Sequence, residues 1–408
     1  MRALLISGGV VAAAAAIFTA VAISAPPATT PTDHPTQPQA ETLQTRLKRL
    51  PRDHRSWAQL TLQYVDQART TGDPTYYTKA EQALKTATHL APEDDAVLTG
   101  TAALAAARHD FTNAVKTAKK AINANPYGPT AYGVLADAQT QLGDLPAATR
   151  TIDRLMSLRP GVPAFTRASY AAELRGDLPE ARKLLTYALN DAFTPSDLAY
   201  CRYYLGELSL RSGDLTQATT WYAKALEASP AFTPAIAGQA RVLALSGQIS
   251  ESVSRYQTVV ERLPLPQYLV EYGEVRIKAG LTPDWTLLRA EQQLLKAAGV
   301  QDDLTWAEFE ADHGTAAAAV RHARAEYAKH PNAVAADALA WALHRSGRDA
   351  EALPYARKAT STGWRNALLY HHRAEIERAL GVRGTAASLV SRYNPRFDPT
   401  LPALARFS

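Results

Sequence analysis

The residue types best suited to metal chemistry gather near the end of this 408-residue sequence, where six of the ten histidines follow residue 312. The nearest approach to a metal motif is His371-His372-Arg373-Ala374-Glu375, because helical spacing would place His371 and Glu375 on one face. No third ligand lies nearby in the sequence. Histidines on a helix surface are therefore the favoured interpretation, and no metal ligand is predicted.

Nucleophilic chemistry is poorly supported. The lone Cys201 excludes an intramolecular disulfide, a CxxC redox motif and a cysteine-based zinc site. As a nucleophile it would need a histidine and an activating charge beside it, and its place just before Tyr204-Leu205-Gly206 is more typical of a packed helix residue. GxGxxG, GxxxxGK[ST], GxSxG and HExxH motifs are absent. The sequence predicts no catalytic residue and no cofactor.

Composition restricts the class of partner. Forty-four basic residues against 39 acidic ones give a net charge of +5, and no run of like charge concentrates it. Nucleic-acid binding is not predicted, because such proteins gather Lys and Arg on one face. With 46% apolar residues the chain has ample material for a packed core.

The N-terminus predicts export. Residues 3–25 carry no charge and follow Arg2, so residues 1–25 are interpreted as a signal peptide or a membrane anchor, with the two left open. Residues 26–42 are rich in Pro, Thr and Gln and are predicted to form an extended spacer. The body is expected outside the cytoplasm, secreted or anchored to the outer face of the cell membrane. It would touch the membrane only through an uncleaved N-terminus.

Any functional side chain would be positioned by predicted helices, and the sequence pattern of these helices repeats about every 34 residues. Small and apolar residues recur at spacings of four and three, as on one face of a packed helix. Gly-Asp pairs such as Gly143-Asp144 and Gly213-Asp214 mark a turn between two helices, because Gly ends one helix and Asp caps the next. The prolines at intervals of 34, 34, 70, 34 and 67 are Pro92, Pro126, Pro160, Pro230, Pro264 and Pro331.

This pattern resembles the tetratricopeptide repeat (TPR) family, whose signature begins W-x2-L-G-x2-Y. Trp57, Leu60 and Tyr64 match it, with Thr61 in place of Gly; Leu205-Gly206 and Tyr132-Leu135-Ala136 match in later units. The overall pattern is similar to uncharacterised exported TPR proteins of actinobacteria. The resemblance implies an all-α fold, a right-handed α-α superhelix of about ten helical hairpins.

The repeat divides the body into three predicted parts. Residues 43–264 hold units one to six, and residues 265–298 form a degenerate seventh unit without the Gly-Asp and Ala markers. Residues 299–408 hold units eight to ten and an irregular C-terminal tail, which is expected to cover the last helix because a solenoid must shield its terminal apolar face.

By resemblance to the family, the first helix of each unit lines a concave groove, and its exposed side chains bind a partner. Aromatic and Arg side chains are favoured at such sites. The sequence therefore predicts an exported, non-enzymatic scaffold for a protein or peptide. The alternative is an exported binding protein for a small ligand or metal that uses the His/Trp cluster of the last repeats. The predicted groove residues are Tyr170, Glu173, Tyr203, Glu207, Arg211, Arg241, Trp341, His344, Arg345, His371, Glu375 and Arg378.

Overall fold

The protein is described by a computed structural model over residues 42–406. This part of the chain forms 21 α-helices and one short 3-10 helix, with no strand. The predicted all-helical fold is confirmed. The predicted export segment and all of the spacer except Thr42 lie outside the described residues. No helix within residues 42–406 has the length and apolar character needed to cross a membrane.

After the short helix α1 (Leu43–Arg49), the helices pair into ten antiparallel hairpins, α2/α3 to α20/α21. The first helices of the hairpins are α2 (His54–Thr71), α4 (Asp95–Ala107), α6 (Pro129–Gln141), α8 (Val162–Leu174), α10 (Pro195–Arg211), α12 (Thr233–Leu245), α14 (Pro266–Lys278), α16 (Asp303–His313), α18 (Ala333–Arg345) and α20 (Ala367–Ala379). The second helices are α3 (Thr75–Leu90), α5 (Phe111–Ala124), α7 (Leu145–Leu158), α9 (Leu178–Asn190), α11 (Leu215–Ala228), α13 (Ile249–Arg262), α15 (Thr286–Ala297), α17 (Ala316–Lys329), α19 (Asp349–Ala359) and α21 (Ala386–Tyr393).

The turn inside a hairpin has the expected chemistry. Gly213 ends α10 with a φ of 77°, a left-handed conformation that favours glycine. The next residue, Asp214, caps α11 by accepting a hydrogen bond from the backbone N–H of Gln217 at 3.0 Å. The Gly-Asp pairs therefore fix where one helix stops and the next begins.

The seventh hairpin is opened by a tryptophan. Trp285 lies in the loop before α15 and packs on Gly273 of α14, where an added Cβ would lie 2.0 Å from the indole ring. Helix α15 then packs against the first repeats: Leu295 belongs to one apolar cluster with Val65 and Leu104. The degenerate unit is thus the point where the array turns back towards its own beginning.

The superhelix closes on itself, because the hairpin turns of the first half meet the loops of the second half. The side-chain amide of Asn332 donates to the carbonyl of Gln141 at 2.7 Å, and that of Asn394 donates to the carbonyl of Leu210 at 3.3 Å. Between these two contacts, an added Cβ on Gly176 would lie 2.2 Å from the carbonyl oxygen of Gly363.

Several first helices are buried on nearly all sides. Every residue from 131 to 139 of α6, from 203 to 210 of α10 and from 335 to 340 of α18 is buried. Second helices such as α7 and α11 instead bury one stripe of three or four residues. The inner surface that the sequence presents as an open groove is thus largely covered.

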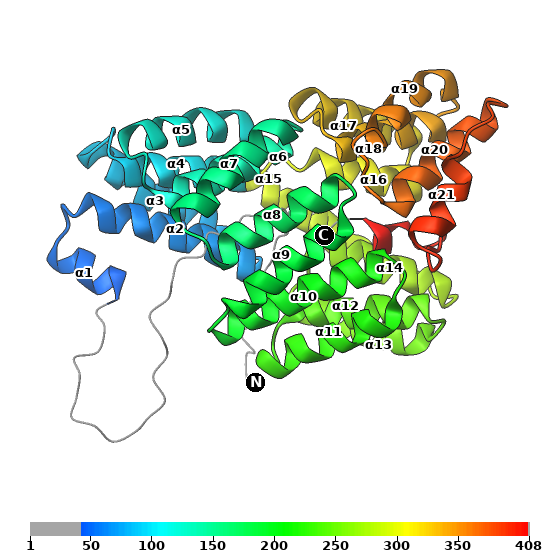
Figure 1. The fold of residues 1–408 in the computed structure, drawn as a ribbon, viewed down its shortest axis with the longest axis horizontal. Coiled ribbons are helices and arrows are strands. Elements are labelled where there is room, and N and C mark those ends of the chain that lie inside the picture. The colour runs from blue at the N-terminus through cyan, green and yellow to red at the C-terminus, as the bar shows by residue number, and fades with distance from the viewer. Residues whose placement is uncertain (1–41, 407–408) are drawn as a thin grey trace, which may run out of the picture.

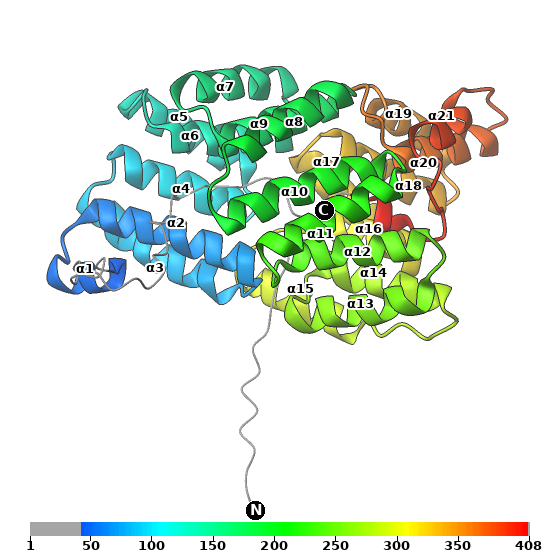
Figure 2. The ribbon, with the colours of Figure 1, turned by 60° about the horizontal axis from the view of Figure 1, so that its bottom comes forward.

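The C-terminal segment, residues 397–406, lies at the centre of the molecule. Its 3-10 helix η1 (Pro402–Ala405) contacts both α14 and α20. In both overall views the red end of the chain lies between the green helices α10 to α14 and the yellow to orange helices α16 to α20 (Figures 1 and 2). The segment was expected to cover the last helix; its 3-10 helix instead lies against α14 and α20, on the inner surface of the array.

Candidate functional site

Five charged side chains on four consecutive first helices form a continuous chain of ion pairs. We call this chain the Arg241 ladder; it consists of Glu173 (α8), Glu207 and Arg211 (α10), Arg241 (α12) and Glu271 (α14). Arg211 donates to Glu173 at 2.9 Å and to Glu207 at 3.3 Å. Arg241 donates to Glu207 at 3.0 Å and, through two parallel bonds of 2.8 and 3.0 Å, to Glu271. The ladder ties the four helices together.

The ladder is a core structure. Arg241 is only 1% exposed. Burial alone lowers the pKa of Arg241, but the carboxylates of Glu271 and Glu207 outweigh it and the pKa rises well above its usual value. Tyr222 and Tyr256 donate from their hydroxyls to Glu207 and Glu271, at 2.6 and 2.7 Å. The charges are therefore compensated inside the protein, as buried ions must be.

Four of the predicted groove residues are buried, so the prediction that they are exposed is wrong. They are Glu173, Tyr203, Glu207 and Arg241. Their side chains point between neighbouring first helices and bond one another across repeats. One feature of the sequence could have predicted their pairing. Glu207 and Arg241 are 34 residues apart, so they place opposite charges at equivalent positions of consecutive repeats. A binding role for these four stays a prediction that would require this core to open.

A second buried ion pair was missed from the sequence. The Arg167 guanidinium on α8 donates twice to the carboxylate of Asp137 on α6, both at 2.8 Å. Burial raises the pKa of Asp137 to about 6, although Arg167 acts in the opposite direction. The pair extends the pattern of the ladder one hairpin further towards the N-terminus.

The other predicted residues remain at least partly accessible. Tyr170 is half-buried and packs against the apolar cluster that contains Leu174 and Trp364. Burial, followed by the nearby Glu173, raises the pKa of its hydroxyl. Arg211 is half-buried at the end of the ladder.

The remaining six predicted residues come together on α18 and α20. We call this group the Trp341 patch; it consists of Trp341, His344, Arg345, His371, Glu375 and Arg378. Two of them, Arg345 and Arg378, are exposed and the other four are half-buried. The structure thus separates the predicted groove residues into a covered set and an accessible set.

Aromatic stacking holds Trp341 in place. Its ring stacks on His372 with centroids 4.1 Å apart and on His344 at 4.9 Å. Its indole N–H donates to Asp312 of α16 at 2.8 Å. The Arg345 guanidinium lies 6.0 Å from the ring centroid, at the edge of cation–π range. A rigid aromatic side chain beside an exposed Arg has the composition of a binding hot spot.

The neighbouring histidine is neutral at physiological pH. Burial, with a further contribution from His372, lowers the pKa of His371 to about 4. The His371 ring also lies 5.3 Å from that of Phe397, in the C-terminal segment. Glu375 forms an ion pair with Arg378. The patch therefore adjoins the C-terminal segment.

The histidines do not converge on a metal site. Within residues 42–406 no group of three or more His, Cys, Asp or Glu side chains is placed to hold a metal ion. His344 contacts Asp349 at 2.5 Å, and His372 contacts Asp337 at 2.8 Å, so each is paired with a carboxylate of its own. Cys201 is fully buried, and burial raises the pKa of its thiol to about 12. It is not a thiolate at neutral pH.

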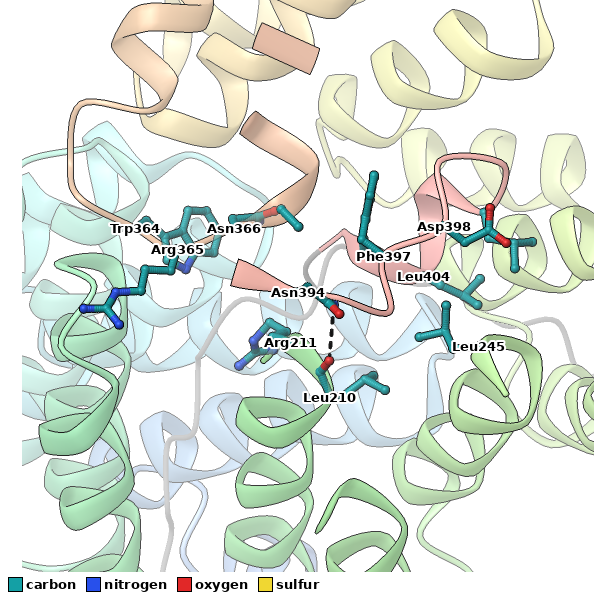
Figure 3. A pocket seen from close by; sticks show the side chains of 13 residues that line it. Leu210, Arg211, Leu245, Trp364, Arg365, Asn366, Asn394, Phe397, Asp398 and Leu404 are labelled. Carbon is teal, nitrogen blue, oxygen red and sulfur yellow. Dashed lines mark hydrogen bonds between the residues drawn. The ribbon is translucent and has the colours of Figure 1, made fainter. Parts of the chain in front are cut away.

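A small cavity lies between the ladder and the C-terminal segment (Figure 3). Its volume of about 30 Å³ has room for a single water molecule. It is lined by Leu210 and Arg211 of α10, by Trp364, and by Asn394, Phe397 and Asp398 next to the C-terminus.

The ten hairpins, the 34-residue period and the Gly-Asp turns are the features of a TPR array. The chain has a TPR-like fold. No protein-family model matches it, and no curated protein matches it.

Several solved structures have a partly similar course of the chain. The TPR protein TTC0263 of Thermus thermophilus is 24% identical, with 43% of this chain and 92% of that chain covered and a TM-score of 0.39. PilW, a type IV pilus biogenesis factor, is 18% identical, with 55% and 96% covered and a TM-score of 0.40. MamA is 19% identical, with 42% and 92% covered and a TM-score of 0.32. At these values the likeness concerns the fold alone.

Proposed function

We propose that this protein is an exported TPR-like scaffold that binds a protein or peptide through the Trp341 patch. The observation that carries the proposal is the state of Trp341, which is held between two histidine rings yet half-accessible and next to the exposed Arg345. Trp, Tyr and Arg are enriched among the few residues that dominate the binding energy at protein interfaces, because aromatic rings bury a large area and Arg donates several hydrogen bonds. The ladder, by contrast, is already satisfied within the fold.

Export is the second part of the proposal. It rests on residues 3–25, which contain no charged side chain and follow a basic residue. A reporter that is active only outside the cytoplasm, fused after Thr42, should be active. Activity of a matching cytosolic reporter alone would contradict export.

Binding is tested with the double variant Trp341→Ala/Arg345→Ala. The 43–408 fragment, used as bait against cell-envelope extracts, should capture a partner that the double variant does not. The variant should keep its helical circular dichroism. Its melting temperature should fall modestly, because the bond from Trp341 to Asp312 is lost.

The chain offers a matched control on the outer face. Trp221 and Lys224 of α11 form a similar pair, with the Lys ammonium 4.9 Å from the indole centroid. Trp221→Ala/Lys224→Ala removes the same kinds of side chain away from the patch, and it should capture the partner as well as the wild type does. Equal capture by all three proteins would show that the partner binds elsewhere.

A further inference from the structure

The C-terminal segment, residues 397–406, makes specific polar contacts with the inner helices. The Arg406 guanidinium forms an ion pair with Asp312 and approaches Glu308 at 3.4 Å, both on α16. The backbone N–H of Ala403 donates to Glu274 of α14 at 2.8 Å. An arginine and a backbone amide of the segment thus each meet a carboxylate of the array.

Apolar side chains of the same segment fill the space beside these contacts. Leu401 is 1% exposed and Leu404 is 6% exposed, and both belong to the cluster that contains Ile236 and Tyr268. Ala403 packs in a second cluster, around Leu269 and Trp306. The segment therefore follows the pattern of a peptide ligand, with apolar anchors followed by a cation.

The surface beneath the segment is rich in carboxyl groups. Glu274, Glu308 and Asp312 all interact electrostatically with Arg406. Two histidines are also nearby: His313 contacts Glu274 at 3.0 Å, and His372 interacts electrostatically with Asp312. Burial, together with the nearby Asp337 and Asp312, raises the pKa of Glu308 to about 7 against the effect of Arg406. Such a cluster of carboxylates favours a guanidinium over a neutral or acidic group.

The array does not run through the segment. It follows the last hairpin, so no repeat depends on it for chain connection, and its only regular element is the four-residue η1. Asp312 also links it to the Trp341 patch, since it accepts from Trp341 at 2.8 Å and pairs with Arg406. A partner on the patch would therefore meet the segment directly.

We propose that the surface of α14 and α16 under residues 397–406 is a binding site for an extended peptide that presents an arginine and apolar side chains, and that the C-terminal segment occupies this site in cis. The inference deepens the proposed function, on which it rests, by naming the chemistry of the partner. Such a partner displaces the segment by placing its own arginine between Asp312 and Glu308.

The experiment uses a fluorescent peptide with the sequence of residues 395–406, PRFDPTLPALAR, and full-length protein. In Arg406→Glu a carboxylate replaces the guanidinium beside Glu308 and Asp312, so the segment should leave and the labelled peptide should bind. We expect at least a tenfold tighter dissociation constant than for the wild type, measured by fluorescence anisotropy. The matched control Arg396→Glu changes the same charge at an exposed position of the tail and should behave as the wild type.

Peptide specificity is tested in the same assay. A peptide with Glu in place of its C-terminal Arg should not bind Arg406→Glu. Equal binding of the two peptides would overturn the assignment of an arginine site, and absence of binding by a folded Arg406→Glu protein would overturn the exchange itself.

A second protein covers the case in which Arg406→Glu does not fold. A protease recognition sequence inserted after Arg396 allows the tail to be cut once the wild-type fold has formed. Excess labelled peptide should then replace the cut fragment during gel filtration, and a fragment that stays bound would contradict exchange. If a partner is captured and the peptide does not inhibit capture, the proposed function stands and the peptide site proposed here is wrong. If the peptide binds but no partner is captured, the peptide site stands and the proposed function is wrong.

Discussion

The Arg241 ladder and the Trp341 patch occupy the same kind of position, on the inward-facing first helices of TPR-like hairpins, yet one is core and the other is accessible. In the ladder, consecutive repeats carry opposite charges at neighbouring positions, so each side chain finds its partner in the next repeat. In the patch the side chains belong to α18 and α20 of the last two hairpins, and within residues 42–406 no hairpin follows α20/α21. Position within a repeat therefore does not decide exposure; the neighbouring repeats do.

The largest expected effect breaks the ladder at its centre. Arg241→Ala leaves Glu207 and Glu271 buried without their guanidinium, which should cost about 3 to 5 kcal/mol of unfolding free energy. Denaturant unfolding measures this loss. Labelling of Cys201, buried on the adjacent α10, should become faster in the variant. The control Arg324→Ala removes an exposed ion pair to Glu351 and should cost less than about 1 kcal/mol. Equal losses in the two variants would show that the ladder is no more important than a surface pair.

The second prediction concerns how the unfolding free energy depends on pH through Glu308, which lies on α16 beside the Trp341 patch. The pKa of Glu308 is raised to about 7 from an ordinary value of 4.5, so the folded state holds this proton more tightly than the unfolded state. Its contribution to stability therefore falls as pH rises from 4.5 to 7. Glu308→Gln removes this penalty, and the stability of the variant relative to the wild type should increase by about 2 to 3 kcal/mol over that range. Unfolding curves at pH 4.5 and 7.5 measure the change, and a difference that is constant with pH would contradict the raised pKa.

The third prediction is a loss of stability when a methyl group is added at Gly238, next to the Arg241 ladder. An added Cβ at Gly238 would lie 2.5 Å from the ring of Tyr222, which is fully buried and donates to Glu207. Gly238→Ala should therefore cost about 1 to 3 kcal/mol. Gly100→Ala is the matched control, because its nearest atoms would lie 3.6 Å away, and it should be neutral or stabilising by about 0.5 to 1 kcal/mol. Thermal melting of both variants tests the difference, and a stable Gly238→Ala would mean that the ring can move.

The smallest expected effect on stability is at the patch. Arg345 is exposed and makes one hydrogen bond, to the carbonyl of Ala311 at 3.0 Å. Arg345→Ala should change the unfolding free energy by no more than about 0.5 kcal/mol while it weakens partner capture. A loss as large as that of Arg241→Ala would place Arg345 in the core and remove the distinction between the two groups.

Much of the local architecture could be predicted from the sequence. The prolines and Gly-Asp pairs at a period near 34 predicted helical hairpins, and turns such as Gly213-Asp214 form as expected. The loss of these markers after Leu281 coincides with the opened hairpin around Trp285. These features depend on residues close together in the chain, so a local pattern is sufficient to specify them.

Tertiary structure alone decided which inner residues are accessible. Asn332 meets Gln141 across 191 positions of sequence, and Asn394 meets Leu210 across 184. These contacts depend on the curvature of the whole array, which accumulates from a small rotation at every hairpin. No short window of sequence encodes that sum. Sequence by itself therefore determined the hairpins and their order. Packing between neighbouring repeats buried the Arg241 ladder and left the Trp341 patch accessible, and the course of the whole array placed Arg406 against Asp312.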